Sequence, residues 1–204
     1  MMQIHLIRHG ATMANEQKLY CGTTDLALSE AGKAELMSLC EQGVYPKGKR
    51  VGERVGEQAK IYITSGFLRT EQTMELLYGA VCREILPQLA EYDFGKFEMQ
   101  GYEALKECSD YQAWIMDKSG AIACPGGERK QDFTRRVLQG FESVLGKVRA
   151  VNAEAFIVCH GGVIACIMEH MRPGVRNFYE WQPKPGRGYT LTYKFDKFRK
   201  YTEI

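Results

Sequence analysis

The sequence predicts an α/β protein in which a mostly parallel central sheet lies between two layers of helices. Three apolar runs of strand length are spread along the chain, and each is followed by a stretch with helical periodicity. A helical insertion separates the second run from the third. The 204 residues, 45% of them hydrophobic, suffice to bury the core of one domain over residues 1–204.

The first strand is expected over residues 4–7, and it stops at Arg8-His9-Gly10. A glycine directly after an apolar run indicates a tight turn, and its missing Cβ lets the backbone approach a ligand closely. Ligands of open α/β sheets bind at the carboxyl ends of strands, which is where Arg8 and His9 fall. A short helix or turn follows, with Asn15 as a neutral hydrogen-bond donor.

The next helix is expected over about residues 30–42, because Ser29 suits an N-cap and the apolar residues after it recur at helical spacing. Residues 43–58 are rich in Gly, Lys and Arg and predict a long surface loop. The second strand, over 61–65, leads into a helix near 67–79. Arg69 lies near the positive end of that helix, where an anion meets both charge and dipole.

Weaker patterns fill the middle of the chain. A short edge strand is expected over 82–86, and two short helices, over about 101–107 and 110–118, belong to an insertion of about residues 92–128 that caps the site. A long helix over about 129–149 follows, because apolar residues recur there every three or four positions.

The third strand, over 156–159, repeats the pattern of the first and ends at His160-Gly161-Gly162. A helix over about 162–171 follows. Residues 189–195 and 198–204 suggest a closing hairpin, whose exposed edge carries lysines.

Two histidines and two arginines thus fall at or just past the ends of three candidate parallel strands: Arg8, His9, Arg69 and His160. Cationic groups collected at strand ends and helix starts make a site for a dianion such as phosphate.

The bulk properties exclude several other classes. The formal net charge is only +2, so no nucleic-acid partner is expected, and no stretch approaches the ~20 apolar residues of a membrane span. The seven cysteines are an odd count, and Cys159 and Cys166 lie within or beside apolar runs, which favours reduced thiols in a cytoplasmic protein. The cysteines form no C-x-x-C pair and, with four histidines, show no ligand spacing, so no zinc site is expected. No cofactor is expected either. The oligomeric state stays open.

The segment Leu6–Asn15 resembles the signature of the histidine phosphatase superfamily, the phosphoglycerate mutase-like proteins. Further landmarks of that family follow in order over nearly the whole chain: Gly22–Asp25, Leu28-Ser29, Ser65–Thr70 with Gln72-Thr73, Glu91–Gly95, Pro125–Glu128 and His160–Gly162. The resemblance implies the phosphoglycerate mutase-like fold. Two departures stand out. Cys21 occupies a position that is polar in many relatives, and Phe97-Glu98-Met99 stands where many relatives have Trp-Glu-Gly.

The resemblance also implies a mechanism. His9 would attack phosphorus and become a phosphohistidine, which water then hydrolyses. Glu91 would be the general acid, while Arg8, Asn15, Arg69, His160 and Gly161 would bind the phosphoryl group. No metal is required, since cationic side chains supply the positive charge.

Three functions remain open: a phosphomonoester phosphatase, a cofactor-dependent phosphoglycerate mutase and a non-enzymatic binding module. The short insertion between Glu91 and Pro125 favours hydrolysis, because the mutases carry a much longer one. Among phosphatases, the cap segment resembles that of α-ribazole phosphatases, in which Tyr111 and Trp114 would line the site and contact a flat heterocycle. A broad-specificity sugar-phosphate phosphatase is the alternative.

Overall fold

The computed structural model describes residues 1–48, 59–195 and 197–204. Its strands form one sheet in the order β3-β2-β4-β1-β5-β6. The bounds are β1 (Met2–Arg8), β2 (Lys60–Thr64), β3 (Arg83–Ile85), β4 (Glu154–Cys159), β5 (Gly188–Lys194) and β6 (Lys197–Glu203). The pairs β3/β2, β2/β4 and β4/β1 are parallel, while β5 and β6 join antiparallel. The predicted mostly parallel sheet and its closing hairpin are therefore confirmed.

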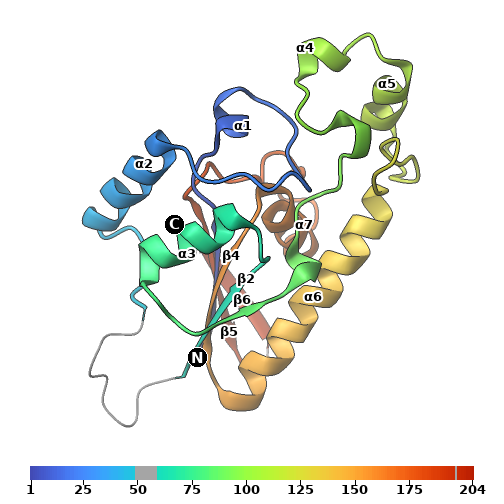
Figure 1. The fold of residues 1–204 in the computed structure, drawn as a ribbon. Helices are drawn as coiled ribbons and strands as arrows, with labels where there is room; N and C mark the ends of the chain where they lie inside the picture. Colours follow the sequence, from blue (N-terminus) through green and yellow to red (C-terminus); the bar gives the residue numbers. More distant parts are fainter. Residues whose placement is uncertain (49–58, 196) are drawn as a thin grey trace.

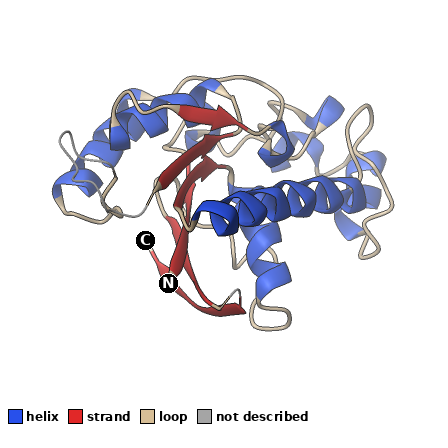
Figure 2. Ribbon diagram, turned by 90° about the horizontal axis from the view of Figure 1, so that it is seen from below, coloured by secondary structure: helices blue, strands red, loops and turns tan. Residues whose placement is uncertain are grey.

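Helices cover both faces of this sheet (Figure 1, Figure 2). Helices α2 and α3 lie on one face, and α6 and α7 lie on the other. The helices and 3-10 turns are α1 (Met13–Glu16), α2 (Glu30–Glu41), α3 (Leu68–Tyr78), η1 (Pro87–Leu89), η2 (Gly95–Phe97), α4 (Tyr102–Leu105), α5 (Ser109–Met116), α6 (Lys130–Val151) and α7 (Gly161–Met171). The expected helices are all present within a few residues of their predicted ends.

The alternation of side chains along the strands divides the core in two. On β4, Ala155 and Ile157 face the larger cluster, which contains the apolar stripe of α6, whereas Phe156 and Val158 face a smaller cluster with Met74 of α3. Because successive side chains of a strand point to opposite faces, a strand covered on both sides is apolar throughout. The continuous apolar run that predicted this strand has that physical origin.

The strand register brings three chain segments to one edge of the sheet. Arg8 is the partner of Cys159, and Thr64 is the partner of Val158, so β1, β2 and β4 end side by side. The amide of His9 donates to the carbonyl of Cys159 at 3.0 Å, which extends the β1–β4 pairing one residue further. The histidines that follow the two central strands are therefore neighbours.

The insertion before α6 lies at this same edge, where α4 and α5 stand beyond the sheet and above the first turn of α6 (Figure 1). The stretch around Gly120 is tied to α6, since the amide of Gln131 donates to the carbonyl of Gly120 at 3.1 Å. Of the predicted loop 43–58, residues 49–58 lie outside the described residues.

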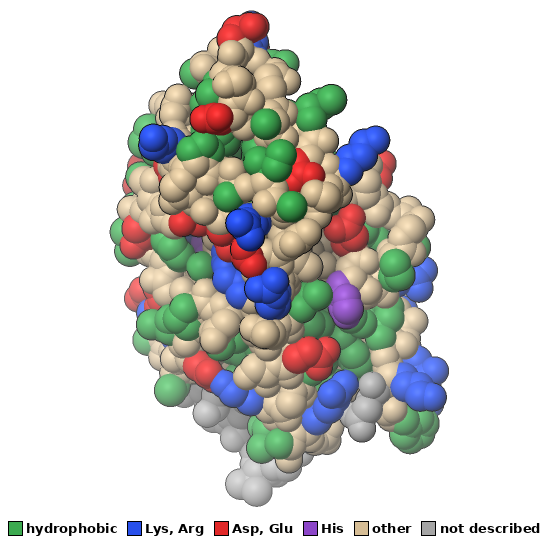
Figure 3. All heavy atoms as spheres, turned by 90° about the vertical axis from the view of Figure 1, so that its right-hand side faces the viewer, with side chains coloured by type: hydrophobic (Ala, Val, Ile, Leu, Met, Phe, Trp, Pro, Cys, Tyr) green, Lys and Arg blue, Asp and Glu red, His purple; other side chains and the backbone are tan. Residues whose placement is uncertain are grey.

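The surface carries charges of both signs. On the face shown in Figure 3, acidic and basic side chains are interspersed, with hydrophobic side chains between them, several near the cap end. No helix in the part of the chain that the structure describes is long and apolar enough to cross a membrane.

Candidate active site

His9 lies at the turn after β1, with only 5% of its surface exposed. Its Nδ1 is 2.7 Å from the carbonyl oxygen of Gly10, and because a carbonyl only accepts, this nitrogen carries the proton. Burial, followed by the charges of Arg8 and Arg69, lowers the pKa of His9 well below its ordinary range. The imidazole is therefore neutral, and its Nε2 keeps a free lone pair.

His160 follows β4, and its ring centroid lies 5.2 Å from that of His9. The ring is fully buried. Nε of Arg69 donates to its Nδ1 at 3.3 Å, and an arginine cannot accept, so the proton of His160 lies on Nε2 and is donated to Ser65 Oγ at 2.8 Å. Both ring nitrogens thus bind protein groups, and His160 holds Arg69 rather than facing open space.

Arg8, the last residue of β1, is held on one side only. Its Nη1 donates to the carbonyl oxygen of Pro183 at 2.8 Å, whereas its buried Nε has no hydrogen-bond partner among the described residues. A Cβ on Gly161 would lie 3.0 Å from the Arg8 guanidinium carbon, so the glycine leaves room for this side chain. A buried cationic N–H without an acceptor is costly. The side chain of Arg8 also lines the cavity described below, where its charge would attract an oxyanion.

Arg69 comes from the first turn of α3 and is 1% exposed. Its Nη1 and Nη2 donate to the carbonyl oxygens of Thr24 and Gly22 at 2.9 and 2.8 Å. These carbonyls and His160 fix the plane of the guanidinium. The remaining N–H groups therefore point in a fixed direction.

Glu91 lies in the segment after η1. Its Oε1 accepts from the amide of Tyr92 and its Oε2 from the amide of Gly162, both at 2.9 Å. A Cβ on Gly162 would overlap this carboxyl group. The second glycine of His160-Gly161-Gly162 therefore makes room for Glu91, as the first does for Arg8.

All of these side chains except His160 line one cavity of about 410 Å³. Its lining includes Arg8, His9, Asn15, Arg69 and Glu91, and beyond them a wall of rings. The rings are those of Tyr20, Tyr92, Phe94, Trp114, Phe133, Phe178 and Tyr179. The cavity is cationic at the end nearest the sheet, and its remaining lining combines the rings with charged side chains such as Asp117, Lys118 and Lys130. Its size suits a small molecule.

Comparison with known proteins agrees with this geometry. The family model "Histidine phosphatase superfamily (branch 1)" matches residues 4–200. The chain belongs to the histidine phosphatase superfamily. It is 30% identical to the adenosylcobalamin/alpha-ribazole phosphatase of Salmonella typhimurium, over 83% of this chain and 79% of that protein.

The chain is also similar to a second curated protein and to a solved structure. The chain is 28% identical to the probable phosphoglycerate mutase GpmB of Erwinia tasmaniensis, over 82% of this chain and 74% of that protein. The crystal structure of a putative alpha-ribazole-5'-P phosphatase from Escherichia coli aligns with a TM-score of 0.78 at 23% identity, over 97% of this chain and 94% of that one. This likeness confirms the phosphoglycerate mutase-like fold, and the family identifies the chain as a phosphatase enzyme.

The two cap residues predicted to line the site of this histidine phosphatase differ in position: Trp114 lines the cavity and Tyr111 does not. Trp114 of α5 lines the cavity, and its Nε1 donates to the hydroxyl of Tyr92 at 3.1 Å. Tyr111, one turn earlier, is 1% exposed and does not line the cavity, so its expected contact with substrate is not available. Its hydroxyl is 2.7 Å from that of Tyr20, and it supports the aromatic wall from behind.

Of the other residues predicted to contact the phosphoryl group, some line the cavity and others lie behind it. Asn15 lines the cavity, while its Oδ1 accepts from the amide of Thr12 at 3.0 Å, which leaves the amide nitrogen of its side chain as a donor. Cys21 also lines the cavity, and burial raises the pKa of its thiol. His160 and Gly161 lie behind the cavity lining, where they support Arg69 and Arg8.

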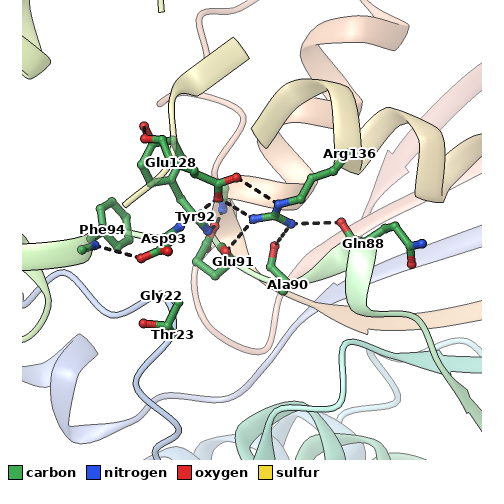
Figure 4. A network of polar contacts seen from close by, with 12 residues as sticks. Gly22, Thr23, Gln88, Ala90, Glu91, Tyr92, Asp93, Phe94, Glu128 and Arg136 are labelled. Atoms are coloured by element: carbon green, nitrogen blue, oxygen red, sulfur yellow. Dashed lines mark hydrogen bonds and ion pairs between the residues drawn. The ribbon is translucent and has the colours of Figure 1, made fainter. Parts of the chain in front are cut away.

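A carboxylate–arginine pair that sequence reasoning missed holds the segment carrying Glu91 (Figure 4). Arg136 of α6 donates to the carbonyl oxygens of Ala90 and Glu91 at 2.7 and 2.8 Å, and to the carboxylate of Glu128 at 2.6 Å. Glu128 also accepts from the amide of Asp93 at 2.9 Å. The Pro-Gly-Gly-Glu landmark was the available signal, but nothing in the sequence pairs it with an arginine on the next helix.

Proposed function

We propose that this enzyme hydrolyses phosphomonoesters through a phosphohistidine formed on His9. One observation carries the proposal: a neutral imidazole, its proton fixed on Nδ1, lies at the cationic end of a cavity that Arg8 and Arg69 also line. A nucleophile needs a free lone pair, and the guanidinium groups of Arg8 and Arg69 would bind the phosphoryl oxygens.

The reaction has two steps. Nε2 of His9 attacks phosphorus in line with the leaving oxygen, and the phosphorus–oxygen bond breaks as the phosphorus–nitrogen bond forms. Glu91 in its protonated form gives its proton to the leaving alkoxide, and its carboxylate then takes a proton from the water that hydrolyses the phosphohistidine. Arg8 and Arg69 stabilise the charge that the equatorial oxygens carry in the transition state.

For the substrate we propose α-ribazole 5′-phosphate or a similar phosphate with a flat ring. The aromatic wall offers ring faces in the same cavity as the cationic end, so a flat base joined to the phosphate through a ribose could pack against them. The name of the Salmonella relative agrees with this choice. We further place the reaction in the cytoplasm, where thiols stay reduced, because all seven cysteines are free.

Trapping the intermediate tests the reaction. Substrate labelled on phosphorus and quenched in base within milliseconds should leave an acid-labile, base-stable label on the protein, and His9→Ala should abolish it. A label on serine, or no label despite turnover, would contradict the mechanism.

A substrate screen with chelator present tests the remaining choices. It should contain α-ribazole 5′-phosphate, sugar phosphates and 3-phosphoglycerate. Hydrolysis of the first at the highest kcat/KM supports the proposal, whereas similar rates on all sugar phosphates favour the broad-specificity alternative. Transfer of phosphate between the two hydroxyl positions of phosphoglycerate would instead favour a mutase, as the name of the Erwinia relative suggests. Loss of activity in chelator that Mg²⁺ restores would refute metal independence.

A further inference from the structure

A single carboxylate, that of Glu98 after η2, binds three consecutive residues of the loop 22–24. Its Oε1 accepts from the amides of Gly22 and Thr23, both at 2.9 Å. Its Oε2 accepts from the amide of Thr24 at 3.3 Å and from the hydroxyl of Thr24 at 2.8 Å. Successive backbone N–H groups that converge on one anion form a concave nest, and a carboxylate seated in it fixes the loop conformation.

The opposite side of the same loop holds Arg69. The carbonyl oxygens of Gly22 and Thr24 accept from its two terminal nitrogens, while the amides of these residues are turned toward Glu98. Within the described parts of the chain, the Arg69 guanidinium donates to these two carbonyls and to His160 and to no other acceptor. The orientation of the guanidinium therefore depends on where the loop holds its carbonyl oxygens, together with its contacts to His160 and to the ring of Phe67, whose centroid lies 4.5 Å from the guanidinium carbon.

One further hydrogen bond and one close packing contact fix the position of the loop 22–24. Asp25 Oδ1 accepts from the amide of Leu68 at 2.8 Å, which ties the loop to the start of the helix that carries Arg69. A Cβ on Gly22 would overlap the carbonyl oxygen of Tyr92 and lie 2.7 Å from Glu98 Oε1. The loop thus lies directly between Arg69 and the segment that carries both Glu91 and Glu98.

We propose that Glu98 is a positioning residue for Arg69: through the loop 22–24 it aims the guanidinium at the phosphoryl group in the transition state. The proposal rests on the phosphoryl-transfer function above. Only a group placed to within a fraction of an ångström contributes fully to transition-state stabilisation, and a shift of about 1 Å can cost about 10²-fold in rate. Glu98 itself touches neither substrate nor His9, so its effect passes through Arg69.

Glu98→Gln tests this proposal. The variant keeps the size of the side chain, but its NH₂ group is a donor facing the donors of the loop. We expect kcat to fall by about 10- to 10²-fold, with a smaller change in KM. The inhibition constant for orthovanadate, which mimics five-coordinate phosphorus, should rise in parallel. Glu103→Gln is the matched control, because Glu103 is an exposed glutamate paired with Lys106, and it should leave all three values unchanged.

A double-mutant cycle with Arg69→Gln separates positioning from a general loss of structure. If Glu98 acts through Arg69, adding Glu98→Gln to Arg69→Gln should lower kcat less than twofold. An equal loss with and without Arg69 would overturn the proposal, as would an unchanged kcat or unchanged vanadate affinity in folded Glu98→Gln. Thr24→Val removes only the hydroxyl contact to Glu98 and should give a smaller loss with the same coupling, so it decides the case if Glu98→Gln does not fold. Absence of a phosphohistidine in the unmodified enzyme would instead refute the proposed function.

Discussion

Substituting Gly162 by alanine should displace the proposed general acid without unfolding the protein. The added Cβ would lie 3.2 Å from the carboxyl carbon of Glu91 and closer still to one of its oxygens. Ordinary contacts between heavy atoms lie at about 3.5–4.0 Å, so the carboxyl group must move by about 1 Å. A displacement of that size costs about 10²-fold, within the ~10²–10⁴-fold that a general acid contributes.

The loss should depend on the leaving group. An alkoxide is a strong base and needs a proton to depart, whereas p-nitrophenolate departs readily without one. We therefore expect Gly162→Ala to lower kcat/KM on alkyl phosphates by about 10²-fold. The burst phase on p-nitrophenyl phosphate, which reports phosphorylation of His9, should change far less. Stopped-flow measurement with both substrates compares the two steps directly.

Stability and a control variant complete this test. Replacing a glycine inside a helix by alanine stabilises the fold by about 0.5–1 kcal/mol. At position 162, the crowding against Glu91 offsets this stabilisation. Gly146 of α6 has open space around the position of its Cβ, so Gly146→Ala should raise the free energy of unfolding by about that amount and leave activity unchanged. Equal slowing on both substrates, or the same loss when Glu91 is already glutamine, would refute this reasoning.

Three other outcomes are expected. Trp114→Ala should weaken binding of phosphates with a flat ring by about 1–3 kcal/mol, with less change for small sugar phosphates; equal changes in KM for both would assign Trp114 to the core. Burial, followed by neighbouring cationic side chains, lowers the pKa of His9 and His160 below the ordinary 6.5, so the unfolded chain binds more protons in acid. The free energy of unfolding should thus fall below about pH 6.5, by up to ~1.4 kcal/mol per pH unit for each histidine. Urea titrations at several pH values give the free energy of unfolding as a function of pH. Its fall below about pH 6.5 should be less steep in His160→Gln, and an equally steep fall in the variant and the unmodified enzyme would contradict this origin. Met99 has φ 56°, where many relatives have glycine, so Met99→Gly should relieve a left-handed conformation and raise the free energy of unfolding by up to about 1 kcal/mol; a decrease in urea denaturation would count against it.

Local patterns in the sequence determine much of the sheet and the cationic end of the site. Residues 156–159 are apolar throughout because both faces of β4 are covered, so their run length and the glycines after them sufficed to predict a strand ending at His160. Parallel strands align their carboxyl ends, so Arg8 and His9 were expected beside His160, and the register confirms this.

Only the tertiary structure decided the roles that depend on contacts between distant segments. Tyr111 and Trp114 lie three residues apart on one short helix, and sequence spacing does not distinguish the ring that faces the cavity from the ring that faces the core. Glu98 looks like a solvated loop carboxylate until the loop 22–24 is folded onto it. Such hydrogen bonds and packing contacts form between residues far apart along the chain, so no local periodicity in the sequence predicts them. A strand or an amphipathic helix, in contrast, shows its pattern in consecutive residues.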